Sequence, residues 1–555
     1  MFKTDVYEIV TKEPGRLVVI VPAMGQNRLD WSPLVDRLKA EPELAGADWV
    51  TYTHNLHFFS SRRLHDVAWG LAAKIQEMHD NIEPYKGITL IGHGVGGLLV
   101  RMAYLIGLQD QGGQEWTRKV DRIILFATLN RGFDPKRWGW FSAPLRGLLL
   151  IPCFRTARSY MKGSSPIAEL RISWIKRFRQ FQQQEAAVGA AAGSTMTSAV
   201  ESGAAGSPAV RTGQDLSQRL WNQPTVIQVN CVHDTYLDED DNADIDQFSR
   251  AKQVRLQGVG RKDTYRLPKG AEQERYASLR HLILTTEGTP DSPHTDPTPR
   301  DIVFLVHGIR ACSSGWPARA AAIVKRDHPG VIPVTAGYRY FSALNFALPF
   351  MRRMQIRWMQ DEYSDRFAKY PNARFYFLGH SNGTYLLGRM LSRVPSARFE
   401  RVTLAGSVLP EDFAWKRLAG TQVGEYQNHR SARDMPVGLL CNMLRGLMMR
   451  DIGTGGFGGF LQSDDNQEVY YYAGGHNAAI KTDDNLARLI HYTLTGETQQ
   501  YSVSTNASHA VMGLASRLMP IVAILLVLAV ALGFYQAWLV TTIVLVVLGI
   551  ILKVM

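Results

Sequence analysis

The sequence is poor in cysteine, and the cysteines that it has form no short paired motif. Only four occur in 555 residues, at Cys153, Cys231, Cys312 and Cys441. The absence of a C-x-x-C pair argues against a disulfide framework and against a zinc site of the usual spacing. This cysteine usage fits a reducing compartment.

Two further features are missing. Charged residues recur between Lys3 and Arg16, so the first residues lack the apolar core of a secretory signal. The net charge is +12, yet there is no nucleic-acid-binding motif or basic repeat. We therefore expect no nucleic-acid partner. Solubility or attraction to an anionic membrane are the remaining explanations of the basic charge.

The chain is too long for a single hydrophobic core, and its pattern suggests two α/β domains. Apolar runs of strand length, such as Leu17–Val21 and Ile88–Ile91, alternate with helical spacing. Such alternation is typical of a doubly wound, mostly parallel sheet. A proline-rich linker at 288–300 ends a first domain at 1–287, and the plan restarts in a second domain at 301–497.

An insertion at about 133–220 interrupts the first domain. It begins with an aromatic and apolar stretch and continues as a basic helical segment at Ile167–Phe181. Residues 182–213 are rich in Ala, Gly, Ser and Thr, which predicts disorder. The insertion is placed where a lid would lie, although a packed cap is equally compatible with the pattern.

The most informative stretch is Gly379-His380-Ser381-Asn382-Gly383. It follows the apolar run Phe375–Leu378 and precedes a helical pattern. Strand, G-x-S-x-G and helix together place a serine hydroxyl on a strained turn at the end of a parallel strand. A second stretch, Gly92–Gly97, has the same surroundings but carries Gly94 in place of the serine. The two turns follow their first strands at nearly equal distances, which indicates an internal duplication.

A nucleophilic serine needs a base and an acid that orients the base. His476 is the first histidine after the last expected strand and is our candidate base. Val437–Cys441 reads as the preceding strand, and Asp451 is the first acidic residue after it. Asp451 is therefore the predicted acid, with Glu411 and Asp412 as alternatives.

The oxyanion hole would be made of two backbone N–H groups. We expect them from Asn382, which directly follows the nucleophile, and from Ile309 after the first strand of the second domain. Chemistry of this kind needs no metal and no organic cofactor, so none is expected.

In the first domain, Asp234 and His281 occupy the acid and base positions, but Gly94 offers no nucleophile. We interpret this site as degenerate. An alternative is that the glycines of Gly92–Gly97 form the G-x-G-x-x-G dinucleotide-binding fingerprint, with Asp110 as the ribose ligand. Against it, that fingerprint normally follows the first strand of its domain.

The C-terminus contains a long apolar segment. After a polar spacer at 498–516, a transmembrane segment is expected at 517–553, because Met519 to Leu552 include no charged side chain. One helix of that length would extend about 51 Å, well beyond a hydrocarbon core of about 30 Å. The turn-prone Gly533–Gln536 lies near its middle, which favours a helical hairpin. Arg517 and Lys553 would then both face the cytoplasm.

Both halves resemble the α/β-hydrolase superfamily of serine esterases and lipases. The resemblance rests on Gly92–Arg101 in the first half, and on Val306-His307-Gly308, Gly379–Gly383 and Gly475-His476 in the second. It implies serine hydrolase chemistry on carboxylic esters. Together with the C-terminal segment and the apolar insertion, it leads us to expect a membrane-anchored esterase that acts on a lipid or another long-chain ester, with both domains on the cytoplasmic side. The alternative is a non-catalytic membrane protein that uses the two hydrolase folds for binding or regulation.

Overall fold

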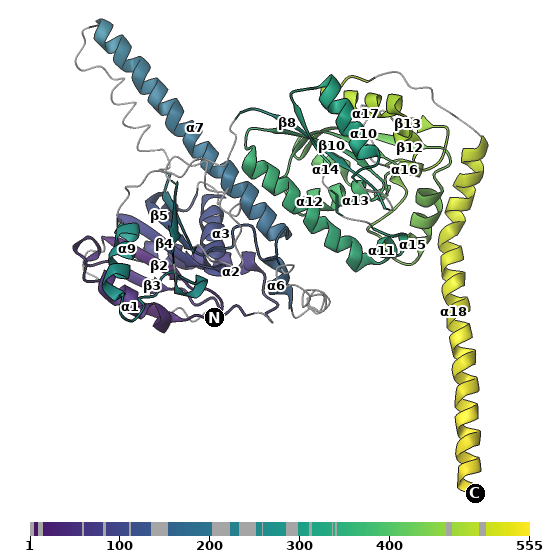
Figure 1. The fold of residues 1–555 in the computed structure, drawn as a ribbon, viewed down its shortest axis with the longest axis horizontal. Coiled ribbons are helices and arrows are strands. Elements are labelled where there is room, and N and C mark those ends of the chain that lie inside the picture. The colour runs from purple at the N-terminus through teal and green to yellow at the C-terminus, as the bar shows by residue number, and fades with distance from the viewer. Residues whose placement is uncertain are drawn as a thin grey trace. The chain divides into compact units, whose positions relative to one another are not determined.

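Figure 1 shows the computed structural model of the chain. The residues that it describes are 5–8, 15–57, 60–81, 85–109, 113–134, 154–202, 223–231, 251–257, 259–284, 298–309, 313–335, 337–338, 341–461, 469–498 and 507–554. The chain divides into two compact units. Unit 1 is Met1–Thr298 with Gln360–Asn372, and unit 2 is Pro299–Met359 with Ala373–Met555.

Unit 1 is built on a seven-stranded sheet in the order β1-β3-β2-β4-β5-β6-β7. All neighbours are parallel except β1 and β3, which pair antiparallel at one edge. Its strands are β1 (Asp5–Glu8), β2 (Arg16–Val21), β3 (Asp48–Thr51), β4 (Gly87–His93), β5 (Val120–Phe126), β6 (Thr225–Cys231) and β7 (Ala251–Leu256).

Helices cover both faces of this sheet. The helices α2 and α3 pack on one face, and α1 and α9 pack on the other. The helices that begin in this part of the chain are α1 (Arg28–Leu38), α2 (Leu64–Asn81), α3 (Val95–Gln109), α4 (Glu115–Lys119), α6 (Arg155–Ser159), α7 (Ser165–Ser202) and α9 (Glu272–Leu284). The short 3-10 turns are η1 (Pro42–Leu44) and η5 (Arg261–Asp263).

Unit 2 has a six-stranded, fully parallel sheet in the order β13-β12-β11-β10-β8-β9. Its strands are β8 (Asp301–Val306), β9 (Val331–Val334), β10 (Arg374–His380), β11 (Phe399–Ala405), β12 (Val423–Ser431) and β13 (Val469–Tyr472). The order β9-β8-β10-β11-β12-β13 corresponds strand by strand to β3-β2-β4-β5-β6-β7 of unit 1. The duplicated, doubly wound α/β fold expected from the sequence is confirmed.

In unit 2, α10 and α17 pack together on one face of the sheet, whereas α13 lies almost wholly buried after β10. The helices are α10 (Trp316–Asp327), α11 (Ala343–Ala347), α12 (Pro349–Lys369), α13 (Asn382–Leu391), α14 (Trp415–Leu418), α15 (Asn442–Gly446), α16 (Gly455–Gly458), α17 (Asp483–Thr495) and α18 (Ala507–Val554). A π-helix, η6 (Pro436–Cys441), and a 3-10 turn, η7 (Ala478–Ile480), complete the unit.

The inserted segment of unit 1 differs from expectation. The helix α7 continues to Ser202, so the disorder expected from residue 182 is wrong as far as that residue. Alanine is the best helix former, and several alanines lie in this stretch. The remainder of the predicted disordered stretch, and nearly all of the predicted linker at 288–300, lie outside the described residues.

The C-terminal segment is one continuous helix, and the hairpin prediction is wrong. The helix α18 has 48 residues, passes through Gly533–Gln536 without a break, and projects away from the rest of unit 2 (Figure 1). A single glycine costs a helix only about 1 kcal/mol relative to alanine, which does not open a turn. The stretch Val511–Ile543 is long and apolar enough to cross a membrane.

Candidate active site

The serine of unit 2 lies on a sharp turn between β10 and α13. Ser381 has φ 54° and ψ −122°, a left-handed backbone conformation that is uncommon for a residue other than glycine. A Cβ at Gly383 would lie 2.4 Å from the carbonyl oxygen of Val306, so only glycine fits there. Such strain in a serine between two elements is typical of a nucleophile elbow.

A histidine and a carboxylate are paired at the same edge of the sheet. His476 follows β13, and its Nδ1 lies 2.9 and 2.8 Å from the two carboxylate oxygens of Asp434. Asp434 follows β12, is fully buried, and also accepts the backbone N–H of Val437 at 3.0 Å. Because a carboxylate can only accept, Nδ1 of His476 carries the proton and Nε2 is left as the basic nitrogen.

The turns around the pair make room for it and hold it in place. Gly406, with φ 53°, follows β11, and a Cβ there would lie 3.0 Å from the His476 ring and 3.2 Å from Asp434. His380, the neighbour of Ser381, bonds through Nε2 to the carbonyl oxygen of His476 at 3.0 Å. Burial lowers the pKa of His380 to about 3, so the ring is neutral and its Nε2–H donates.

The serine and the histidine meet at this edge without a hydrogen bond. The strand register places the ends of β10, β11, β12 and β13 in successive positions across the sheet. The rings of His380 and His476 are 4.5 Å apart between centroids. The structure records no hydrogen bond between Ser381 Oγ and His476, both of which it describes. Contacts between catalytic groups are often long without substrate and tighten in its complex.

The chain after β8 lies against the serine, as an oxyanion loop would. A Cβ at Gly308 would lie 2.6 Å from Cβ and 3.0 Å from Oγ of Ser381, and Ile309 follows directly. Asn382 is the first residue of α13, where a backbone N–H has no partner within the helix. Its side-chain Nδ2 donates to the Tyr338 hydroxyl at 3.0 Å, which in turn donates to the His307 carbonyl at 2.8 Å. These two bonds connect the two predicted oxyanion segments.

Asp451 is not the carboxylate that pairs with His476, which corrects the sequence prediction. Its carboxylate accepts from Arg352 and from the Tyr385 hydroxyl, each at 2.8 Å. Burial raises the pKa of Asp451, but the Arg352 charge and the Tyr385 hydrogen bond outweigh burial and hold this pKa below its usual value.

The two alternative acids do not reach His476 either. Glu411 accepts from the hydroxyl of Thr454, and Asp412 is exposed. The error arose because the apolar run 437–441 was interpreted as a strand. It is a π-helix, and the true strand β12 is rich in polar residues.

The matching turn of unit 1 differs from that of unit 2 in more than the serine. Gly94 keeps the left-handed conformation, with φ 56°. His93 Nε2 lies 3.1 Å from the carbonyl oxygen of Arg261, as His380 does with His476. Arg261 therefore occupies the position of the base. Its guanidinium donates to the carbonyl oxygen of Ala127, the residue that corresponds to Gly406.

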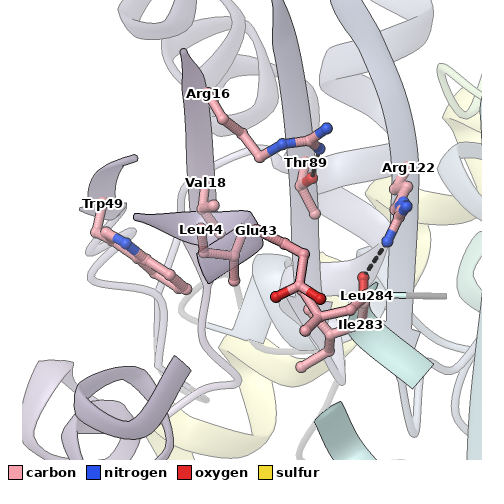
Figure 2. Close-up of a pocket in the computed structure, with 9 residues that line it drawn as sticks. All are labelled: Arg16, Val18, Glu43, Leu44, Trp49, Thr89, Arg122, Ile283 and Leu284. Atoms are coloured by element: carbon pink, nitrogen blue, oxygen red, sulfur yellow. Dashed lines mark hydrogen bonds between the residues drawn. The ribbon is translucent and has the colours of Figure 1, made fainter. Parts of the chain in front are cut away.

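His281 is not near Gly94, so its predicted role as a base is wrong. It is exposed in the last turn of α9. Figure 2 shows Ile283 of that turn accepting a hydrogen bond from Arg122, close to Arg16 and Thr89. These three side chains belong to the starts of their strands, whereas Gly94 follows a strand end. A small cavity of about 40 Å³ lies there, at the edge of the sheet opposite Gly94.

Asp234 lies outside the described residues. In the sequence it follows the end of β6 by three residues, as Asp434 follows the end of β12. Its expected place as an acid is therefore consistent with the chain order of the two units. Among the described residues, no three His, Cys, Asp or Glu side chains gather closely enough to hold a metal ion.

The glycines of the unit 1 turn are required for packing. A Cβ at Gly96 would lie 2.0 Å from the Val21 carbonyl oxygen, and one at Gly97 would lie 2.0 Å from the Thr128 hydroxyl. Gly383 packs on the corresponding strand of unit 2 for the same reason. The glycine pattern thus has a structural explanation that needs no dinucleotide.

Comparisons with known proteins found similar chains among solved structures alone. No protein-family model and no curated protein matches the chain. Similar solved structures include an esterase from Thermogutta terrifontis, with 12% identity over 49% of this chain and 92% of its own and a TM-score of 0.25. A study of carboxylesterases from Nitrososphaera gargenis supplies another, with 16% identity over 50% and 94% and a TM-score of 0.26.

A third is a lipase-esterase related protein from Clostridium acetobutylicum, with 11% identity over 50% and 99% and a TM-score of 0.27. Scores this low carry no argument of their own. The fold follows instead from the two matching parallel sheets, each with a glycine-flanked turn between its central strand and a helix. Both units of this chain have the α/β-hydrolase fold.

Proposed function

We propose that unit 2 is a serine hydrolase that cleaves carboxylic esters. The observation that supports this most strongly is the pairing of His476 with buried Asp434 at the edge of the sheet where Ser381 lies on its strained turn. Serine, then acid, then histidine is also the order along the chain that this fold uses.

The reaction follows from the positions of these groups. Ser381 Oγ transfers its proton to Nε2 of His476 while it bonds to the ester carbonyl carbon. The carbonyl oxygen becomes an oxyanion, which the backbone N–H groups of Asn382 and Ile309 stabilise. His476 returns the proton to the departing alcohol. It then deprotonates a water that attacks the acyl carbon, and it gives that proton to Ser381 Oγ as the bond to the serine breaks and the carboxylic acid leaves. Asp434 stabilises the imidazolium in both steps.

We further propose that α18 anchors the enzyme in a membrane and that its substrate is a lipid or another long-chain ester. The apolar stretch exceeds the thickness of a bilayer core, and a tilt would accommodate the excess. Arg517 lies near the N-terminal end of this stretch, directly before its charge-free part, which favours the cytoplasmic side for the hydrolase units. Unit 1 would be non-catalytic, since it has Gly94 and Arg261 where unit 2 has serine and histidine.

The direct test is ester hydrolysis by the detergent-solubilised full chain, with short-chain and long-chain p-nitrophenyl esters. Ser381→Ala should lower kcat by about a thousandfold or more, because no other group replaces the nucleophile. The matched control is Ser392→Ala, an exposed serine at the end of α13. Equal activity of wild type and Ser381→Ala would favour the alternative function, a non-catalytic binding protein.

A further inference from the structure

The apolar helix α18 is joined to unit 2 close to the acid of the candidate triad. The side-chain Nδ2 of Asn442 donates to the Ser516 carbonyl at 2.7 Å, and the Ser516 hydroxyl donates to the carbonyl of Gly438. The backbone N–H of Gly438 in turn donates to the carbonyl of Asp434 at 2.8 Å. Figure 1 shows α15 beside the first turns of α18.

This contact extends into the charge-free part of the helix. A Cβ at Gly446 would lie 2.6 Å from Cα of Pro520, so the end of α15 touches the helix there. Ala523 is still 2% exposed, whereas Ile524 is 50% exposed. The charge-free stretch begins at Leu518, so the contact reaches about 8 Å into it along the helix axis. Unit 2 therefore extends to the depth of a headgroup region if α18 spans a bilayer.

The segment that follows α15 at this depth has an unusual surface. Met448 is 79% exposed and has φ 64°, a left-handed conformation that is uncommon for its residue type. Single exposed apolar residues are ordinary, but a strained one beside an apolar helix points to function. Arg450, two residues further along the chain, and Arg517, in the early part of α18, are both exposed. Apolar tips with basic neighbours suit an anionic bilayer surface.

The same side of unit 2 leads to the active site. Met435 directly follows Asp434 and is 57% exposed. Only η6 and α15 separate it from Gly446, a helical path of about 16 Å at most. If Met448 lies among the lipid headgroups, Asp434 and the part of the site around it are therefore close to the lipid.

We infer that the Met448 loop, defined as Leu447–Arg450, is a second membrane contact that inserts into the interface of an anionic bilayer beside α18. This inference rests on the proposed membrane anchor. It deepens the proposed function, since it makes a lipid of that same bilayer the substrate class of unit 2.

The test uses the full chain in phosphatidylcholine vesicles with and without phosphatidylglycerol. An environment-sensitive fluorophore is placed by Met448→Cys, and quenching by spin-labelled lipids measures its contact with the bilayer. The control is Arg326→Cys at the end of α10, where the side chain is 70% exposed; α10 packs with α17 on the sheet. Val527→Cys, at a position 51% exposed in α18, reports on the anchor itself. The unsubstituted chain, treated with the same reagent, corrects for labelling of its own cysteines.

We expect strong quenching at 448 and 527 and little at 326, with less quenching at 448 when phosphatidylglycerol is omitted. Quenching at 527 without quenching at 448 would overturn the inference and leave the anchor intact. No quenching at 527 would overturn the anchor. Equal quenching at 448 in neutral vesicles would refute the role of the arginines.

Hydrolysis gives a second readout. Met448→Asp should lower hydrolysis of a long-chain ester in the bilayer about tenfold and leave a soluble short-chain ester unaffected. Loss of both activities would show that the substitution damages the site rather than the membrane contact.

Discussion

The two turns at Gly94 and Ser381 occupy the same place in two sheets of the same strand order, but their surroundings have changed in different ways. The bond from the histidine before the turn to the loop after the last strand is retained in both units. The reactive side chains are not retained, because Arg261 stands where His476 does. The comparison shows that this hydrogen bond has a structural role that both units need. The serine and the histidine are needed only for the reaction that we propose for unit 2.

The largest difference should come from neutralising two carboxylates in turn: Asp434, which pairs with His476, and Asp451, the acid that the sequence predicts. Asp434→Asn should lower kcat about a thousandfold or more, because an amide no longer stabilises the imidazolium of His476. Asp451→Asn should leave kcat nearly unchanged and destabilise unit 2 by about 3 kcal/mol, because Arg352 is fully buried and would lose its counter-charge. Kinetics and urea denaturation measure the two effects. The reverse pattern would restore Asp451 as the acid.

A smaller effect on kcat is expected at Gly406, which corresponds to Ala127 of unit 1 and differs from it by a single methyl group. Gly406→Ala should lower kcat about ten- to a hundredfold, because the new Cβ would press on both His476 and Asp434. The corresponding change in unit 1, Ala127→Gly, should leave activity unchanged. Both positions have a positive φ, at 53° and 42°, so the backbones are comparable. Equal effects of the two changes on kcat would mean that backbone strain at the positive φ, and not pressure on the His476–Asp434 pair, causes the loss.

The retained histidines should make both units sensitive to acid. Burial lowers the pKa of His93 to about 4 and that of His380 to about 3. The unfolded chain binds these protons near pH 6.5, so the contributed stability is complete above that pH and is lost as the pH falls towards 4. At pH 5, each of these histidines should lower the free energy of unfolding of its unit by about 2 kcal/mol. Urea denaturation from pH 7.5 to pH 5 measures this. His380→Gln should reduce the dependence in unit 2 alone, and the remainder comes in part from buried His429, whose pKa is also lowered to about 3.

The smallest signal should come from rebuilding the site of unit 1. Gly94→Ser with Arg261→His should give slow labelling by a fluorophosphonate probe at residue 94, measured in a Ser381→Ala background. Gly94→Ser alone should give none, because it supplies no base. Labelling of the single variant at the rate of the double variant would show that Arg261 does not stand in the place of the base.

The sequence predicted the parts of the fold that depend on local pattern. Apolar runs such as Ile302–Val306 and the glycines of both turns identified the buried parallel strands and the duplication. The polar strand β12 was missed, because its burial comes from tertiary packing rather than from an apolar run, and with it Asp434 was missed. Had β12 been recognised, the matching offset of Asp234 from β6 would have indicated Asp434.

Other errors have the same origin. Arg261, in the chain after β7, is not a residue type that marks the position of a base, so the sequence indicates His281 instead. The hairpin in α18 was inferred from a local turn signal, but one glycine is too weak to end a helix whose neighbours all favour it.

The central claim is that covalent chemistry is confined to unit 2. Fluorophosphonate labelling of the full chain, followed by peptide mapping, tests it most directly. The account predicts one adduct, on Ser381, which disappears in Ser381→Ala, and none on unit 1. Equal labelling of the wild type and Ser381→Ala would contradict it.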